Sequence, residues 1–384
     1  MITTIVDKNY LYKEARFLLA SIYKYMPQEK VYLFLVNCPK DVKEDVLSWN
    51  PNAIIDFREF DVPQEQYKSY MYVMMTFVFD WLLNEIKTKE NIIYLDADIV
   101  LKGNIYNLYK ELEKYDLLFR YHPFNRIKGP TTEEFGGIMN NGCVVIKNNN
   151  VMKEYAKRLK ENIQNYLDTK KDPVYYHKDI HLVTCIDQEM IFTTYLEMKD
   201  KIKFFPLNNI YNDTQYTKES IVWHAKGVHR TYPEYLIECW KYKREDVNIF
   251  KEHLRLYYRK FKKFIKNFLI EPPESFKIKE LEDIFKSIEI RNIIIVNSDF
   301  YLDNEDVFKD KLVECYDTDP VIYYKNKIKL ENKKILHKYI IYDTQLIKKK
   351  DVDLLICEEK NLRIIADNIA DNKFKQKIIV GNID

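Results

Sequence analysis

Two acidic residues separated by one alanine, Asp96 and Asp98, follow an apolar run in the segment NIIYLDADIVL over residues 91–101. A hard divalent cation such as Mg²⁺ or Mn²⁺ prefers oxygen ligands and commonly takes one or two carboxylates together with substrate phosphates. If the chain turns as it leaves its strand, both carboxylates can converge on one cation and form a seat for a diphosphate. The alternative is a strand end closed by a local hydrogen-bonded turn. The tripeptide alone leaves both readings open.

Two further Asp-x-Asp triplets stand in different surroundings. Asp317 and Asp319 directly precede Pro320, which is typical of a turn. Asp351 and Asp353 precede the apolar run LLICEE, so they lie at the wrong end of a strand for a ligand crevice. Both triplets are predicted to be turns or helix caps.

Three later segments add polar groups that could act beside such a cation. Residues 140–142, Asn-Asn-Gly, interrupt an apolar run and fit either a strand-entry turn or a site. Asp187 fits either a helix N-cap or a site. His224 ends an apolar run, where a histidine is usually structural. A histidine that joins two aspartates would serve as a third ligand, particularly for Mn²⁺, because imidazole suits transition metals better than Mg²⁺.

The pattern around these residues predicts a mostly parallel α/β sheet. Nearly continuous Ile, Val, Leu and Tyr runs alternate with helical stretches, as in sheets that helices cover on both faces. In such open sheets ligands bind beyond the carboxyl ends of the strands, which is where the aspartate pair lies. The expected strands are residues 2–6, 30–36 and 91–96, and the expected helices are residues 10–26, 39–49 and 72–86.

The composition bounds the class of protein. The chain has 384 residues, 46% of them hydrophobic, which is enough for a packed core and argues against global disorder. A net charge of +2 gives no sign of a nucleic-acid partner. The 6 cysteines are widely separated without a C-x-x-C pair, so no zinc ribbon or disulfide framework is indicated. We find no signal-peptide pattern and no apolar run of membrane-spanning length, and we expect a cytoplasmic protein.

A change of texture near residue 270 predicts a domain boundary. The segment NFLIEPPESFKI, residues 267–278, contains adjacent prolines and indicates a linker. Beyond it, four apolar runs predict a second, small α/β unit: 291–297, 338–343, 353–359 and 377–383. We expect three parts, which are a catalytic domain over 1–240, a basic helical extension and linker over 241–272, and a small domain of unknown role over 273–384.

The basic extension has two readings. Residues 242–269 place Phe250, Leu254 and Tyr257 at three- and four-residue spacing, with Lys and Arg on other faces. Such a helix either packs its aromatic stripe on the catalytic domain or lies as a peripheral element on an anionic membrane. An oligomer is compatible with either reading.

Taken in order, the polar segments over residues 1–240 resemble one family. The order is Thr-x-x-Asp-x-x-Tyr at the first strand, then DAD, NNG, DQ and finally His-x-x-Gly-x-x-Arg. The chain resembles nucleotide-sugar glycosyltransferases of the GT-A fold, closest to the retaining family 8 that includes glycogenin. Two departures stand out. The helix before the DAD strand, YMYVMMTFVFDWLL, lacks the usual Lys or Arg, and the closing motif ends RTY where the family often has Lys-Pro-Trp.

The resemblance implies roles for the metal and phosphate residues. Asp96 and Asp98 match the metal-binding triplet, with Asp98 the firmer ligand, and His224 matches the closing histidine that completes protein ligation. Gly227 lets its loop approach the diphosphate. Arg230 stands where the family usually has a lysine on the phosphates.

The resemblance also implies how the remainder of the donor is held. The family's nucleoside-binding segment is matched by Thr4, Asp7 and Tyr10, and Tyr10 is suited to stacking on uracil. The residues that face the donor sugar in the family are matched by Asn140, Asp187 and Gln188.

The implied activity is transfer of a sugar from a nucleoside diphosphate sugar, UDP-linked as the first expectation, to an acceptor hydroxyl with retention. Mn²⁺ or Mg²⁺ would bridge the phosphates, and the acceptor would be a glycan, glycoprotein or glycolipid. Gln188 is a poor nucleophile, so front-face attack by the acceptor is favoured. Two alternatives remain: a GT-A transferase of another family, perhaps inverting, or a binding protein that kept the fold without turnover.

Overall fold

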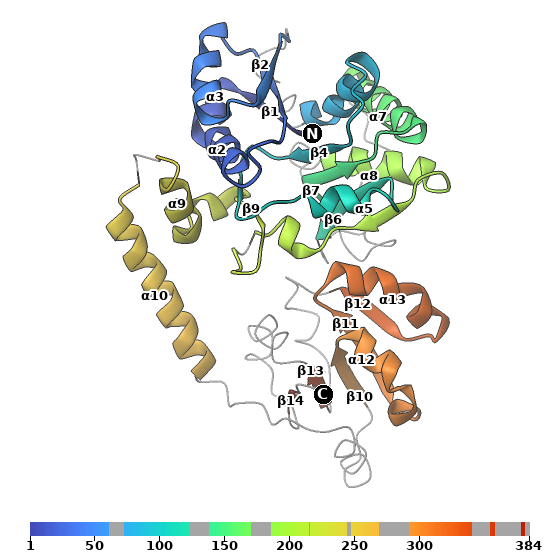
Figure 1. The fold of residues 1–384 in the computed structure, drawn as a ribbon. Coiled ribbons are helices and arrows are strands. Elements are labelled where there is room, and N and C mark those ends of the chain that lie inside the picture. The colour runs from blue at the N-terminus through green and yellow to red at the C-terminus, as the bar shows by residue number, and fades with distance from the viewer. Residues whose placement is uncertain are drawn as a thin grey trace. The chain divides into compact units, whose positions relative to one another are not determined.

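The computed structural model describes residues 1–60, 73–122, 138–169, 186–214, 216–243, 247–268, 292–339, 354–357 and 378–380 (Figure 1). The chain divides into two compact units, each described here by itself. The described residues of the first lie within Met1–Tyr121 and Ile138–Leu256. Apart from His122, those of the second lie within Tyr257–Asp384.

A mostly parallel sheet forms the centre of the first unit. Its described strands have the order β3-β2-β1-β4-β7-β6-β8. β1 pairs in parallel with β2 and β4, β2 with β3, and β6 with β8, whereas β4 and β7 are antiparallel. The predicted α/β class is thereby confirmed. The strand bounds are β1 Ile2–Asp7, β2 Val31–Val36, β3 Ala53–Arg58, β4 Ile92–Leu95, β6 Leu117–His122, β7 Ile138–Ile146 and β8 Phe204–Pro206.

Helices flank this sheet, with α2 and α3 beside β1 and β2 and with α7 and α8 near β7 (Figure 1). The predicted helix 10–26 begins earlier, at Lys8, because the carboxylate of Asp7 accepts a hydrogen bond from the backbone N–H of Tyr10 at 2.8 Å. The bounds are α1 Lys8–Tyr10, a π-helical turn Leu11–Ala15, α2 Arg16–Tyr25, α3 Lys43–Trp49, α5 Asn107–Glu111, α7 Asn150–Thr169, α8 Ile186–Met198 and α9 Pro233–Trp240.

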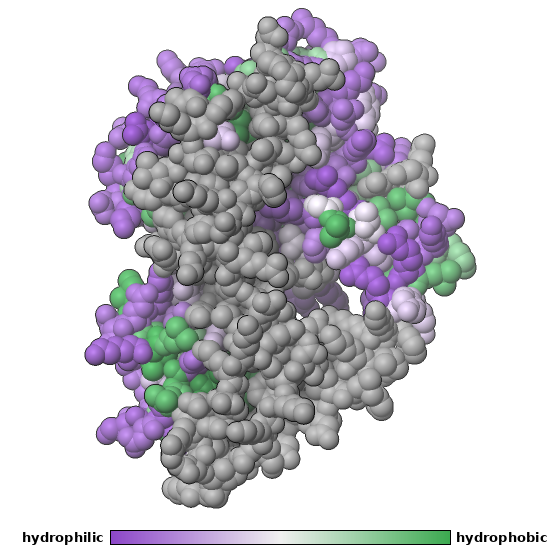
Figure 2. Space-filling model, turned by 180° about the vertical axis from the view of Figure 1, so that it is seen from behind, coloured by the Kyte–Doolittle hydropathy of each residue, from purple (hydrophilic) through white to green (hydrophobic). Residues whose placement is uncertain are grey.

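The predicted helix 72–86 is helical over residues 73–80 and continues as a π-helical turn, Trp81–Glu85, while residue 72 lies outside the described residues. A large apolar cluster joins these layers. Ile2, Leu18, Leu33 and Ile93 are each fully buried in it. Burial of such side chains is the main favourable contribution to folding. Figure 2 shows hydrophilic residues over much of the described outer surface of this unit.

The second unit holds a smaller parallel sheet with the order β12-β11-β10-β13-β14. The four predicted strands correspond to β10 Asn292–Val296, β12 Leu336–Tyr339, β13 Leu354–Cys357 and β14 Ile378–Val380, with several predicted ends outside the described residues. The predictions missed β11 Leu312–Asp317. The described helices of this unit are α12 Ser298–Asp303 and α13 Pro320–Asn332.

The second Asp-x-Asp triplet has a structural role. Asp319 caps α13 by accepting a hydrogen bond from Val321 N at 2.7 Å. Asp317 is buried at the end of β11, and its carboxylate accepts from Ser298 Oγ at 2.6 Å and contacts His337 Nε2 at 2.6 Å. The triplet at residues 351–353 lies outside the described residues.

The basic segment predicted over 242–269 contains α10, Ile249–Phe268. Phe250, Leu254 and Tyr257 are all exposed, at 72%, 55% and 71% of their surface. Figure 2 shows hydrophobic and hydrophilic residues side by side at the edge where α9 and α10 lie. Within the described parts of the chain, no helix is both long and apolar enough to span a bilayer.

Candidate functional site

A strand pairing brings the three predicted metal ligands together. The chain leaves β4 at Leu95, turns through Asp96 and Asp98, and enters β5, Ile99–Leu101. β5 pairs antiparallel with β9, Val222–His224, so that Ile99 lies opposite His224. The pairing is extended by a hydrogen bond from Ala225 N to Asp98 O at 2.9 Å. Two segments distant in sequence thereby form one rigid corner.

Side-chain atoms of the three residues converge at this corner. Nε2 of His224 lies 3.4 Å from Oδ2 of Asp96 and 3.2 Å from Oδ1 of Asp98. One ligand atom from each residue can be chosen so that all lie within 4.8 Å of one another. Two carboxylates and an imidazole suit Mn²⁺, and the oxygens also suit Mg²⁺. The donor set and its spacing therefore fit a divalent cation.

The two carboxylates differ in charge behaviour. Burial raises the pKa of Asp96 to about 6, although His224 opposes the rise. Burial also disfavours the charged form of Asp98, yet His224 and Arg230 together hold its pKa below the ordinary value. Tyr94 donates a hydrogen bond to Oδ1 of Asp96 at 3.0 Å, and burial raises the pKa of this tyrosine well above its ordinary value. Asp98 is thus the more firmly ionised ligand.

The second ring nitrogen of His224 is held from behind. Nδ1 of His224 lies 2.9 Å from Oδ1 of Asn212, an oxygen that can only accept. Nδ1 therefore carries a proton, which leaves Nε2 as the ring nitrogen available to bind a cation. Arg120, which is fully buried, donates from Nη1 to the carbonyl oxygen of Asn212. Such outer partners commonly fix the tautomer of a metal-binding histidine.

Gly142 allows this approach. A Cβ built on Gly142 would lie 2.5 Å from Cε1 of His224 and closer still to Nδ1. The backbone N–H of Gly142 donates to Oδ1 of Asn140 at 3.0 Å, and Asn212 Nδ2 donates to the same oxygen at 2.9 Å. The glycine of the NNG segment thus lets β7 pass directly beside the imidazole.

A cavity of about 320 Å³ opens at this corner. The predicted site residues that line it are Tyr10, Asp96, Asp98, Asp187, Gln188, His224 and Arg230. The site therefore combines groups from β1 and its helix, the β4–β5 turn, α8 and the end of β9. It lies beyond the carboxyl ends of β1 and β4, where open α/β sheets bind ligands.

Four predicted site residues lie outside the lining. Asn140 is fully buried behind His224, and its neighbour Asn141 faces the cavity instead. Thr4 is fully buried, with Oγ1 lacking a hydrogen-bond partner among the described residues. Asp7 caps the following helix. Gly227 has φ +59°, a left-handed conformation that favours glycine, and its Cβ position faces open space.

Asp187 contributes a polar wall. It is 7% exposed, and Asn141 Nδ2 donates to its Oδ2. Its other oxygen, Oδ1, is buried without a hydrogen-bond partner within the described part of the chain. Burial and the negative charge of Asp96 raise the pKa of Asp187 to about 7. A buried acceptor that faces a cavity is suited to a ligand hydroxyl, because leaving such a group unpaired is costly.

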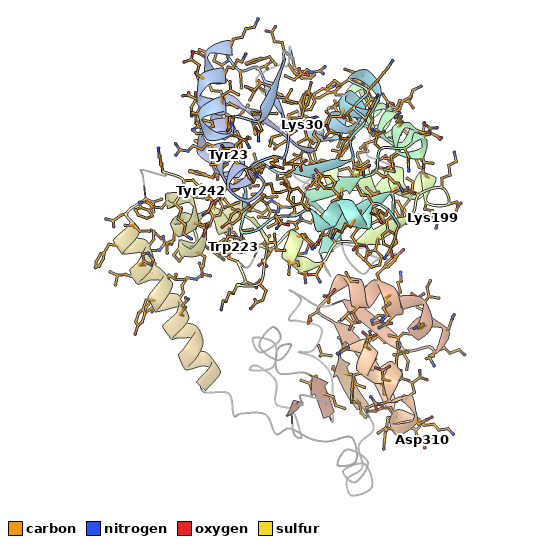
Figure 3. All side chains as sticks on the ribbon, in the orientation of Figure 1. Tyr23, Lys30, Lys199, Trp223, Tyr242 and Asp310 are labelled. Carbon is orange, nitrogen blue, oxygen red and sulfur yellow. The ribbon has the colours of Figure 1, made fainter. Side chains whose placement is uncertain are left out.

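Several lining residues were absent from the sequence predictions. Lys226 lies two positions after His224 and lines the cavity together with Asn141, Tyr94 and Met75. Trp223, labelled in Figure 3, lies on β9 with its ring 4.6 Å below the ammonium of Lys102. A signal for Lys226 was present in the closing segment HAKGVHR, whereas no local pattern identifies Asn212 as the partner of the histidine.

No protein-family model matches this chain, and no curated protein matches its sequence. Among solved structures, the chain is similar to the glycosyltransferase GlyE of Streptococcus pneumoniae TIGR4, with 13% identity and a TM-score of 0.42 over 99% of this chain and 90% of that one. It is also similar to the active-site mutant Q189E of LgtC, with 14% identity and a TM-score of 0.38 over 59% and 87%. The bifunctional glycosyltransferase WbbM gives 11% identity and a TM-score of 0.41 over 66% and 51%.

A substitution at Gly142 tests the packing behind the imidazole. Gly142→Ala should push His224 out of place and weaken Mn²⁺ binding about tenfold or more. Gly103→Ala is the matched control, because its added Cβ would meet Ile221 at an ordinary 3.5 Å. Isothermal titration with Mn²⁺ measures both variants. Equal Mn²⁺ affinity in Gly142→Ala and wild type would contradict this packing.

The raised pKa of Asp187 predicts a pH-dependent effect on stability. Folded Asp187 keeps its proton up to about pH 7, while the unfolded residue loses it near pH 4, so wild-type stability falls as pH rises through this window. Asp187→Asn removes that loss and should stabilise the protein by roughly 1–4 kcal/mol at pH 8 and little at pH 4. Denaturant unfolding across this range measures the difference. The exposed Asp200→Asn is the control, and a pH-independent difference for Asp187→Asn would contradict the assignment.

Proposed function

We propose that this chain is a metal-dependent glycosyltransferase that uses a nucleoside diphosphate sugar, with UDP as the first choice of nucleotide. The observation that carries the proposal is the convergence of Asp96, Asp98 and His224 at one corner of a cavity that Asp187 also lines. A cation seat and a buried hydroxyl acceptor within one cavity match a ligand with a diphosphate at one end and a sugar at the other.

The residues of this cavity divide the donor among them. Asp98 and His224, with Asp96, would hold the divalent cation through Oδ and Nε2 atoms. When bound, that cation neutralises charge on the diphosphate as it leaves. Tyr10 is 40% exposed at the rim and offers a ring face to a uracil base.

The sugar end of the cavity is assigned to α8. Oδ1 of Asp187 would accept a hydrogen bond from a donor-sugar hydroxyl, and Gln188 lies beside it in the lining. Once deprotonated, Asp187 would also favour the positive charge that develops on the sugar ring. Among the described residues, the lining presents no carboxylate beyond Asp96, Asp98 and Asp187. This supports front-face attack by the acceptor with retention over a dedicated nucleophile.

The strand order supports a GT-A assignment of the first unit, because a parallel sheet followed by one antiparallel strand sets the acidic turn at the sheet's carboxyl edge. Two alternatives use the same cation ligands. An inverting transferase additionally requires a catalytic base on the acceptor side, whereas a binding protein without turnover requires only the cation ligands and the sugar contacts.

A peripheral membrane contact through residues 242–269 remains a proposal that the exposed face of α10 supports. Phe250, Tyr257 and Tyr258 are each more than half exposed, and Lys and Arg residues lie close to them in the sequence. Aromatic side chains together with basic groups favour the interface of an anionic bilayer. Such a contact would suit a glycolipid acceptor. Glycan and glycoprotein acceptors, a cytoplasmic location and oligomerisation likewise remain predictions.

The donor assignment is tested with the wild-type chain and one variant. UDP with Mn²⁺ should raise the melting temperature, and a panel of nucleotide sugars should show metal-dependent hydrolysis of at least one. Asp98→Asn should lose both responses while keeping the fold, because Asp98 is the firmly ionised ligand. Asp319→Asn is the matched control, since it alters another Asp-x-Asp triplet and asparagine caps a helix equally well.

The outcomes separate the candidate functions. Stabilisation by UDP and Mn²⁺ without hydrolysis or transfer for any donor would favour the binding protein. A product of inverted anomeric configuration, determined by NMR, would assign the chain to an inverting family. Absence of any stabilisation by UDP and Mn²⁺ would refute the proposed function.

Membrane contact is tested by co-sedimentation with liposomes. Vesicles that contain anionic lipid should carry the protein down, and neutral vesicles should carry much less, because both apolar and electrostatic contributions are needed. The double variant Phe250→Ser/Tyr257→Ser should reduce sedimentation severalfold. Tyr23→Ser alters a comparably exposed ring on α2 and serves as the control. Equal sedimentation of the α10 variant and wild type would exclude this face.

A further inference from the structure

The loop that follows β9 carries two cations, Lys226 and Arg230, and both line the cavity. Gly227–Thr231 forms a 3₁₀ turn that follows Lys226 and contains Arg230, so the two side chains leave the loop at different points. Lys226 is exposed, whereas Arg230 is partly buried. This difference in exposure assigns each of them a separate task.

Arg230 is committed to the protein on several sides. Its Nε and Nη2 donate to Oδ2 of Asp98 at 3.1 and 2.5 Å, and Nε also donates to the carbonyl oxygen of Ala225 at 3.1 Å. Nη1 lies 3.4 Å from the hydroxyl of Tyr10, and the guanidinium carbon lies 5.3 Å from the centre of that ring. A planar guanidinium can satisfy these partners together, whereas an ammonium is a point charge.

These contacts divide the carboxylate of Asp98. Oδ2 faces Arg230, and Oδ1 faces Nε2 of His224 at 3.2 Å. Rotation of the carboxylate would break both hydrogen bonds from Arg230 to Oδ2. Because Asp98 already neutralises much of the Arg230 charge, the guanidinium has less field left for a diphosphate.

Lys226 differs from Arg230 in exposure and reach. Its side chain is exposed, and its positive charge lowers the pKa of both Asp96 and Asp187, which line the same cavity. It thus acts on the space between the cation seat and the sugar wall. A flexible stem with a compact, strongly hydrated charge suits a phosphate group that arrives and departs.

We propose that Lys226 binds the diphosphate of the donor, and that Arg230 is a positioning residue that orients Asp98 and steadies Tyr10. The inference deepens the proposed function and rests on it for the nature of the ligand. It gives Arg230 a task different from the phosphate contact expected from sequence. It also makes Lys226 the cation that contacts the donor, since the helix before the DAD strand has no Lys or Arg over residues 73–83.

Binding measurements separate the two tasks. Titration with Mn²⁺ alone reports on the seat, and titration with UDP or uridine at saturating Mn²⁺ reports on the diphosphate and the base. Lys226→Met should leave Mn²⁺ and uridine affinity within twofold of wild type and weaken UDP about tenfold. Lys218→Met, which removes an exposed charge outside the lining, is its control and should leave all three unchanged.

Arg230→Met should weaken Mn²⁺ alone by about tenfold or more, even though it removes a like charge, because the orientation of Asp98 is lost. Arg230→Lys keeps the charge and should recover only part of the Mn²⁺ affinity. The control is Arg158→Met, which removes an exposed arginine of α7 outside the lining and should leave Mn²⁺ affinity unchanged. Circular dichroism of each variant establishes that the fold is retained, and Arg230→Lys decides the matter if Arg230→Met does not fold.

Three outcomes would overturn the inference. These are UDP affinity in Lys226→Met equal to that in Lys218→Met, Mn²⁺ affinity in Arg230→Met equal to wild type, and tighter Mn²⁺ binding in Arg230→Met, which would make Arg230 a competing charge. Failure of the proposed function looks different. Wild-type protein would then bind Mn²⁺ without binding UDP, which removes the role of Lys226, while the Mn²⁺ titrations still decide the role of Arg230.

Discussion

The hydrogen bond between Nδ1 of His224 and Oδ1 of Asn212 determines what the candidate site can bind. If Asn212 presented its amide nitrogen instead, the proton would move to Nε2, and the imidazole would donate to the aspartates and bind no cation. The orientation of Asn212 is fixed in turn, since its Nδ2 donates to Oδ1 of Asn140, an oxygen that also accepts from the backbone N–H of Gly142. A main-chain amide has one polarity, so it sets the direction of every bond in the series.

This series also explains why polar residues lie in a fully buried layer. Asn140 and Asn212 are both 0% exposed, and burying polar groups is costly unless their hydrogen bonds are made. Here Oδ1 of Asn140 and both polar side-chain atoms of Asn212 make hydrogen bonds in a line that ends at the imidazole, whereas Nδ2 of Asn140 has no hydrogen-bond partner among the described residues. This line fixes the tautomer of His224, which an apolar layer could not do.

Part of this arrangement could be predicted from sequence. The apolar runs indicated β1, β2 and β4 because parallel strands buried on both faces are almost continuously hydrophobic. The position of Asp96 and Asp98 at a strand end, and of His224 at another, led to their expected convergence. The convergence is caused by the pairing of β5 with β9, which sets Ile99 opposite His224. Each of these strands has only three residues, so neither shows this antiparallel pairing in its own sequence pattern.

Other features depend on information that no local pattern contains. Identifying Asn141, and not Asn140, as the residue that faces the cavity requires the direction of successive side chains on β7, which alternates and is set by tertiary pairing. Asn212 lies in an irregular segment without periodicity. Predicting the contact of Arg230 with Tyr10 requires the distance between the loop after β9 and the first helix, which the sequence does not contain. The sequence thus indicates where these residues lie along the chain, whereas the direction of each side chain depends on the tertiary structure.

The ladder between β5 and β9 has a consequence for biogenesis. Residues 102–221 separate its two strands in the sequence, and pairings of such long range form late because closing the intervening loop costs entropy. During synthesis the acidic turn leaves the ribosome well before its histidine. A nascent chain therefore carries two aspartates without a complete seat, and it acquires cation affinity only after the polypeptide up to β9 has emerged and folded.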